Sequence, residues 1–108
     1  MARHWPLPKK NTYISGGADI HTAPAEIAAV NCFISSIRLS NNAASATTFT
    51  LIDKSAGLNK HYDAVSLAAD SVSNEQFPEE QELYCAGGFD IQASQAGIEA
   101  VIIYWTKP

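Results

Sequence analysis

Two stretches in the middle of the chain alternate between apolar and polar side chains, over residues 32–40 and 46–55. A period of two is typical of a half-buried β-strand. Asn41 and Asn42, between the stretches, tolerate turn conformations. We therefore predict two neighbouring strands joined by a hairpin of about five residues. The apolar residues expected on one shared face of this hairpin are Phe33, Ile37, Leu39, Phe49 and Leu51.

Further short strands are predicted on both sides of this hairpin, separated by turn signals at intervals of about 8 to 12 residues. Seven or eight short antiparallel strands predict a single all-β domain, a β-sandwich or jelly-roll-like fold, with a small barrel as the other architecture. Residues 24–30 are ambiguous between a short helix and an extended segment. The expected strands cover residues 12–15, 62–67, 71–77, 83–86, 89–93 and 98–106.

The last predicted strand differs from the others because both of its faces are apolar. Ala100, Ile102 and Tyr104 alternate with Val101, Ile103 and Trp105. A strand with two apolar faces is expected to be central or covered on both sides.

Residues 1–11 are expected to form an extended N-terminal arm, followed by a β-sandwich domain over residues 12–108. Two prolines disfavour both a helix and a central strand in the arm. One interpretation is a frayed terminus. The other is a segment that becomes ordered on a neighbouring subunit, with Trp5 and Leu7 as apolar anchors and Arg3, Lys9 and Lys10 as rim contacts.

Charge is distributed unevenly along the chain. Residues 1–10 hold three of the seven basic side chains and no acid, whereas residues 75–90 hold five acids and no base. Glu79, Glu80 and Glu82 are expected to form a solvated acidic corner. The segregation predicts a head-to-tail contact between identical subunits, in which the arm of one meets the acidic corner of the next; the alternative is that both are simply exposed.

The overall composition excludes several classes of partner. A net charge of −4 argues against a nucleic-acid backbone as the main partner, because phosphate binding needs clustered Lys and Arg. No apolar run approaches the roughly 20 residues that cross a bilayer, and no secretory signal is evident, so synthesis in a cytoplasm is expected. Cys32 and Cys85 are expected to be buried, reduced thiols; a bond between them is the alternative.

No catalytic, cofactor or metal constellation is evident, and we expect a protein without enzymatic activity. His61 and Asp63 could share one face of a strand, and we expect a surface pair rather than a catalytic dyad. Isolated glycine pairs, including Gly87-Gly88, are expected to be turns. Paired acids for glycoside hydrolysis stay open, because carboxylate separation cannot be obtained from sequence. The acids concerned are Glu79, Glu80, Glu82 and Asp90.

The segments 36–41, 46–53, 89–93 and 98–104 together resemble small β-sandwich structural proteins of tailed bacteriophages. The resemblance covers about residues 30–108, and it is one of pattern: a strand ending in Ser-Asn, a Thr-rich partner, and an Ala-Gly corner before the last strand. It contains no functional motif, so it carries over no binding residue. For residues 1–11 it implies an arm that connects neighbouring subunits.

The expected function is that of a capsid decoration or cement protein, located in the virion and made in the host cytoplasm. Its expected partners are the major capsid protein or other virion proteins and further copies of itself, with a trimer favoured. One alternative is a carbohydrate- or receptor-binding module of a tail tip or fibre, and another is a neck or head-to-tail connector. The aromatic platforms for the carbohydrate alternative would be Trp5, Tyr62, Tyr84 and Trp105.

Overall fold

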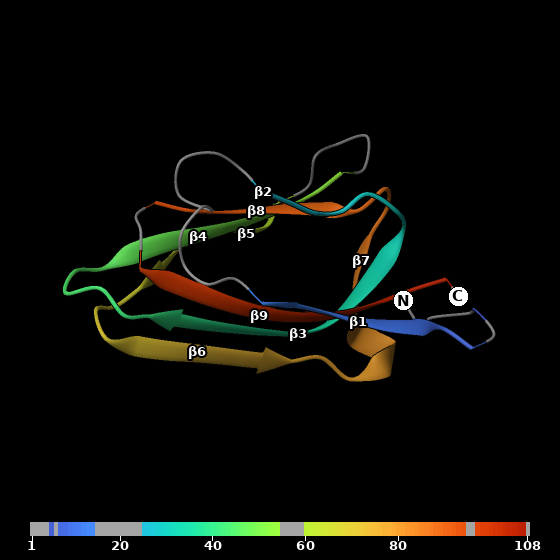
Figure 1. The fold of residues 1–108 in the computed structure, drawn as a ribbon, viewed down its shortest axis with the longest axis horizontal. Coiled ribbons are helices and arrows are strands. Elements are labelled where there is room, and N and C mark those ends of the chain that lie inside the picture. The colour runs from blue at the N-terminus through green and yellow to red at the C-terminus, as the bar shows by residue number, and fades with distance from the viewer. Residues whose placement is uncertain (1–4, 6, 15–24, 55–59, 95–96, 108) are drawn as a thin grey trace.

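The computed structural model of the chain describes Trp5 and residues 7–14, 25–54, 60–94 and 97–107. Within these ranges the chain forms nine β-strands and one short 3-10 helix, η1 (Glu79–Gln81), and the strands build two sheets that pack face to face (Figure 1). The expected all-β sandwich is confirmed. The strands are β1 (Lys9–Ile14), β2 (Ala25–Ala28), β3 (Cys32–Asn41), β4 (Thr47–Asp53), β5 (Lys60–Leu67), β6 (Ser71–Gln76), β7 (Leu83–Cys85), β8 (Phe89–Ala93) and β9 (Ile98–Thr106).

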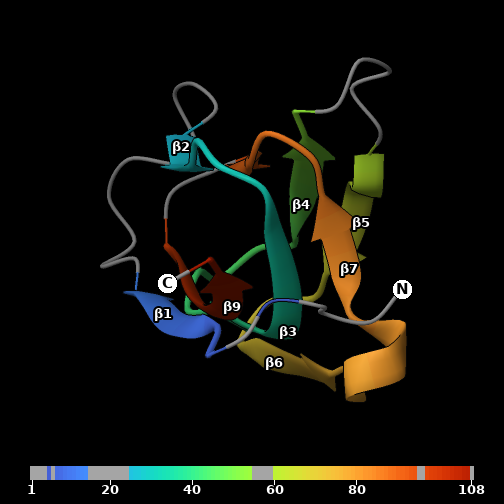
Figure 2. The same ribbon diagram turned by 90° about the vertical axis from the view of Figure 1, so that its right-hand side faces the viewer.

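All pairings in the two sheets are antiparallel. One sheet has five strands in the order β1-β9-β3-β6, with β7 paired to β3, and the other has four strands in the order β2-β8-β4-β5. Strand β9 is central, between β1 and β3, as its two apolar faces predict. Figure 2 shows β7 and η1 at one side of the sandwich, next to β3 and β6.

The core lies between the sheets and follows the alternation of the sequence. In β4 and β8 every second residue is buried and the residues between them are half-buried. Burial of large apolar side chains is the main term that stabilises such a fold. The largest apolar side chains of this core that are fully buried are Phe49, Phe89, Ile34, Leu51, Ile91, Ile98 and Ile102.

The predicted hairpin between β3 and β4 is wrong, because these two strands belong to different sheets. Strand β3 pairs with β9 and β6, and β4 pairs with β5 and β8. The connection is an arch held by the buried side chain of Asn41. Its Nδ2 lies 3.0–3.2 Å from the carbonyl oxygens of Ser45, Leu67 and Ala68, and its Oδ1 accepts from the Ala43 amide at 3.0 Å. Asparagine satisfies backbone groups in an arch as well as in a hairpin, so turn chemistry alone did not separate the two.

A bulge in β3 corrects a second expectation. The register with β9 shifts between Ile34 and Ser36, and an extra residue in a strand reverses which face the following side chains occupy. Cys32 and Ile34 therefore belong to the same core cluster as Ile37 and Leu39. Phe33, expected on the core face, lies on the opposite, outer face of the sheet.

The structure also decides three local expectations, which concern residues 25–28, the start of the sheet near Lys9 and the Gly87-Gly88 turn. Residues 25–28 of the ambiguous segment form strand β2. Strand β1 begins at Lys9, so residues 9–11 are part of the sheet and pair with the end of β9. Gly87 and Gly88 both have positive φ, as expected of a turn. At Gly88 a Cβ atom would also collide with the backbone carbonyl of Ala28, so this position requires glycine.

Candidate functional site: the outer face of the five-stranded sheet

Four cross-strand rows make up the face of the five-stranded sheet that points away from the core. Residues directly opposite each other in an antiparallel pair point to the same side. We call these four rows the outer face. They are Glu99, Ser40 and Val72; then Ile14, Val101, Arg38 and Asn74; then Thr12, Ile103, Ser36 and Gln76; then Lys10, Trp105, Phe33 and Tyr84.

The middle of the outer face is apolar. Ile14 is 70% exposed, and Val101, Ile103 and Trp105 beside it are half-buried. Val72, in the edge strand β6, is also 56% exposed, but Arg38 and Ser40 of β3 separate it from the apolar side chains of β9. An antiparallel sheet that faces water on one side normally carries polar side chains there, so contiguous apolar side chains at such a place mark an interaction surface.

An aromatic cluster forms one end of this face. The rings of Trp5 and Phe33 meet edge to face at a centroid distance of 5.3 Å, and those of Phe33 and Tyr84 lie 4.8 Å apart. Trp105 is the cross-strand partner of Phe33. Trp5 thus covers Phe33 of its own chain, which explains why Phe33 is only 3% exposed although it lies outside the core.

An open depression of about 380 Å³ lies beside this cluster. Lys10 from β1 lines it together with Glu79 and Glu82 from the acidic corner, so one chain brings together the basic and acidic groups that the sequence places far apart. The remaining lining is mixed, and gives the depression hydroxyl, carboxamide and aromatic groups. It consists of Ser35, Ser36, Gln76, Phe77, Ile103 and Trp105.

The other predicted contact residues are distributed around this region. Lys9 and Glu80 are exposed. Leu7 is 86% exposed and has a positive φ of 53°. Arg3 lies outside the described residues. The contact between subunits that these residues were expected to make stays a prediction.

Glu82 corrects the expectation of a fully solvated acidic corner. Glu79 and Glu80, in η1, are exposed, but Glu82 is only 5% exposed. It immediately precedes β7, whose pairing with β3 draws the chain back toward the sheet. Asp90 lies on β8 of the other sheet, in ion-pair range of Lys54, and does not line the depression with Glu79 and Glu82.

His61 is paired with a different acid from the one expected. Its Nε2 lies 2.9 Å from Oδ2 of Asp53, which is buried on β4. The register of β5 against β4 is irregular between Tyr62 and Val65, and this irregularity changes which residues of β5 share a face. Among the described residues no hydroxyl or thiol is hydrogen-bonded to His61.

Tyr62 does not belong to the aromatic cluster. It lies on β5 of the four-stranded sheet, and its ring meets that of Phe49 edge to face at 5.9 Å. Burial raises the pKa of Tyr62, and hydrogen bonding with Glu75 of β6 and its negative charge raise it further.

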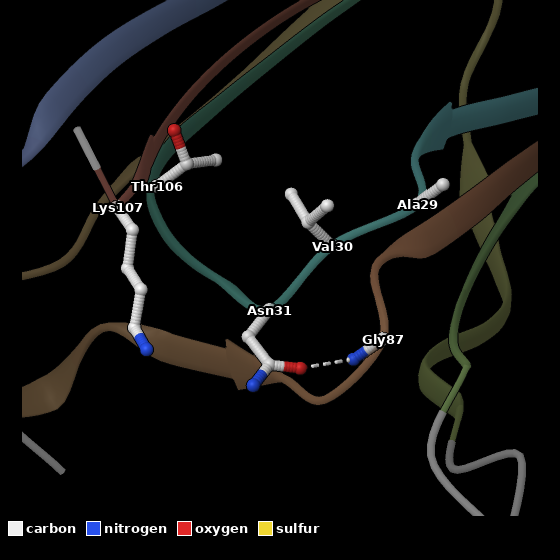
Figure 3. A pocket seen from close by; sticks show the side chains of 6 residues that line it. All are labelled: Ala29, Val30, Asn31, Gly87, Thr106 and Lys107. Carbon is white, nitrogen blue, oxygen red and sulfur yellow. Dashed lines mark hydrogen bonds between the residues drawn. The ribbon is translucent and has the colours of Figure 1, made fainter.

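Two other depressions offer less varied chemistry. The larger, of about 540 Å³, lies at the end of the sandwich where β9 ends and the β7–β8 turn begins. In this depression the Asn31 side-chain oxygen accepts a hydrogen bond from the Gly87 amide at 2.7 Å (Figure 3). The other, of about 320 Å³, lies on the outer surface of the four-stranded sheet and is lined by Thr48, Thr50, Gln92, Ala93 and Ser94.

The described residues contain no group of three or more His, Cys, Asp or Glu side chains placed to hold a metal ion. They also contain no helix with the length and apolar character needed to pass through a bilayer.

Sequence reasoning missed most of the outer face. Ile14, Val101 and Ile103 were not expected to form a surface, although the unbroken apolar run of the last strand was the available signal. Ser35, Ser36 and Gln76 carry no motif, and they come together through the bulge at Ser35 and the pairing of Ser36 with Gln76.

A scan against protein-family models, a search of curated proteins and a search of solved structures each found no match to this chain.

Proposed function

We propose that this chain is a non-enzymatic structural protein of a virion, a decoration or cement protein that docks on the capsid of a tailed phage. The outer face is the docking surface in this proposal. The capsid is proposed as the partner because the sequence resembles small β-sandwich structural proteins of tailed phages. The outer face is proposed as the docking surface because of the apolar side chains that the sheet places there.

The observation that carries the proposal is the exposed apolar centre of the outer face. Ile14, Val101 and Ile103 are neighbours across β1 and β9, on an otherwise solvent-facing side of a sheet. Protein interfaces commonly combine such an apolar centre with aromatic side chains and a polar rim. Trp105 supplies an aromatic group here, and Lys10 and Glu79 supply rim charges of both signs.

The mixed rim has a consequence for specificity. Rim charges of both signs contribute little affinity, but they penalise a partner that presents the wrong charge at either position. The matching capsid surface would therefore place an acid opposite Lys10 and a base opposite Glu79.

The N-terminal segment has a narrower role in this proposal than the sequence predicts. Trp5 packs on Phe33 of its own chain, so in this proposal it contributes to the aromatic cluster, and its role as an anchor on a neighbour stays a prediction. Leu7, 86% exposed, is the apolar side chain that a second subunit would cover in a homo-oligomer, with a trimer favoured.

Locating the chain on particles tests the proposal directly. Antiserum against the purified chain, with gold-labelled electron microscopy of tailed particles from the source cells, should label the capsid surface as a lattice. Label confined to the neck would favour a connector. Particles without label would overturn the proposal.

A pair of variants then tests the docking surface. Ile14→Asp places a charge in the apolar centre and should weaken binding to capsids stripped of the chain by at least about tenfold, the equivalent of about 1.4 kcal/mol. Val30→Asp is the matched control, because Val30 is 57% exposed but lies at the end of the sandwich. Equal binding by both variants would exclude the outer face as the docking surface.

A second candidate function is carbohydrate binding at a tail tip or fibre. Trp105 next to the hydroxyls of Ser35 and Ser36 and the carboxamide of Gln76 gives the depression a stacking surface with hydrogen-bonding groups around it. A glycan array separates the two functions. A hit that Trp105→Ala abolishes favours carbohydrate binding, whereas capsid labelling with a blank array favours the decoration protein.

A further inference from the structure

Cys32 and Cys85 are directly opposite each other in the pairing of β3 with β7. Both side chains are fully buried and both thiols are free. Residues directly opposite in an antiparallel pair have Cα atoms about 4.5 to 5.5 Å apart. A disulfide spans Cα separations of about 4.4 to 6.8 Å, so this pair is placed for a bridge without a rearrangement of the backbone.

The environment of the pair makes the thiols unreactive while the strand is closed. A hydrogen bond with Cys32 raises the pKa of Cys85 above its ordinary value, and burial raises it further. The thiolate is the reactive form of cysteine. The thiols therefore react only when this part of the chain opens to solvent.

Strand β7 is the element that can open. It has three residues, Leu83–Cys85, and within the described ranges it pairs only with β3. Short elements at the side of a sheet open locally at a smaller free-energy cost than the core does. Asn31 and Gly87, which line the larger depression, lie one residue before Cys32 and two after Cys85 along the chain.

We propose that Cys32 and Cys85 are a redox-active pair that forms an intramolecular disulfide when the chain meets a disulfide oxidant such as glutathione disulfide. The thiolate of one cysteine attacks the oxidant, breaks its S–S bond and forms a mixed disulfide, releasing one glutathione. The other cysteine then displaces the second glutathione and forms the protein S–S bond. Two protein thiols are oxidised, one glutathione disulfide is reduced, and the two thiol protons end on the two glutathione molecules.

The bridge would lock β7 onto β3. Tyr84 of β7 is part of the outer face, and Glu82 beside β7 lines the depression. In the reduced chain the side of the depression that Glu82 forms could therefore move away with β7. In the oxidised chain the bridge would hold it in place. The bridge also closes a long loop, from residue 32 to residue 85, which restricts the unfolded chain.

Incubation of the folded protein with glutathione disulfide tests the proposal, with and without urea below the unfolding midpoint. The expected product is a monomer lighter by two hydrogen atoms that contains a Cys32–Cys85 cross-linked peptide. Urea should accelerate formation of the bridge, because β7 must open first. The thermal midpoint of the bridged monomer should lie more than roughly 10 °C above that of the reduced chain, and should return to the reduced chain's value after reduction.

Cys32→Ala and Cys85→Ala are the matched controls, and each should bind at most one glutathione and show no rise in the thermal midpoint. Three results from the wild-type chain would overturn the proposal. They are retention of both thiols under all these conditions, a stable glutathione adduct without a bridge, and a disulfide-linked dimer.

Discussion

The two sheets share one core, but their outer surfaces differ. On the four-stranded sheet the outward side chains of β4 and β8 are largely polar, and the hydroxyls of Thr50 and of Ser94, directly after β8, bond to the backbone of neighbouring strands. The Ser94 hydroxyl accepts from the Thr48 amide at 2.9 Å, and the Thr50 hydroxyl accepts from the Ala64 amide at 3.0 Å. On the five-stranded sheet the corresponding central positions hold Val101, Ile103 and Trp105.

This difference is the basis for proposing a docking surface on one side of the sandwich only. Polar side chains are solvated by water, whereas exposed apolar side chains cost free energy until another surface covers them. Both surfaces rest on the same buried layer. Changes to that layer should therefore affect the whole protein, and changes to the outer surfaces should affect only what each surface does.

The largest effect is expected from two adjacent isoleucines of β9. Ile102 is fully buried and Ile103 is half-buried on the outer face. Ile102→Ala should lower the free energy of unfolding by about 2–5 kcal/mol, through lost burial and the cavity that remains. Ile103→Ala should cost under about 1.5 kcal/mol. Urea denaturation measures both, and equal costs would contradict the assignment of inner and outer faces.

The next effect concerns the arch that connects the sheets. Asn41→Ala leaves buried carbonyl groups without their partner and should lower the free energy of unfolding by about 2–3 kcal/mol. Asn42→Ala is the control, because Asn42 is exposed and its backbone amide still donates to the Gly97 carbonyl. Its expected change is within about 0.5 kcal/mol. A neutral Asn41→Ala would show that the arch does not need this side chain.

A smaller effect compares the outer surfaces themselves. Ile14→Ser removes an exposed apolar group from the five-stranded sheet and should shorten retention on a hydrophobic-interaction column. Gln92→Ser, on the outer surface of the four-stranded sheet, should leave retention unchanged. If both variants behave alike, the contrast between the two surfaces does not exist in solution.

The smallest effect is the pH dependence contributed by Tyr62. Its pKa in the folded protein is raised above the ordinary value of 10.0, first by burial and then by Glu75. The folded chain therefore holds this proton more tightly than the unfolded chain. The resulting stability is complete below about pH 10 and is lost as the pH rises above that value.

Urea midpoints measured at about pH 8 and about pH 11 test this dependence. Tyr62→Phe keeps the ring against Phe49 and removes the titrating group, so its midpoint should fall less over this interval than that of the wild-type chain. A fall as steep as in the wild type would assign the alkaline sensitivity to other groups.

Particular residues show how far sequence reasoning extends. The parity of Phe89, Ile91 and Ala93 correctly predicts an inward and an outward side for β8. The two apolar faces of residues 98–106 correctly predict a central strand, and the same pattern was the signal for the outer face. The charges of Lys10, Glu79 and Glu82 were recognised as a candidate contact between subunits, but not as the lining of one depression.

The amino-acid sequence by itself determined the class of fold and the inward sides of β4, β8 and the second half of β3, because side chains in a strand alternate with a period of two whatever the strand pairs with. Only the tertiary structure decided which strands are neighbours. The backbone hydrogen bonds of β3 are equally compatible with β4 or β9, so the pattern does not select between them. The same holds for the one-residue bulge that moves Phe33 outward, and for the pairing that places Cys32 opposite Cys85. Each depends on how distant segments pack, which local alternation does not encode.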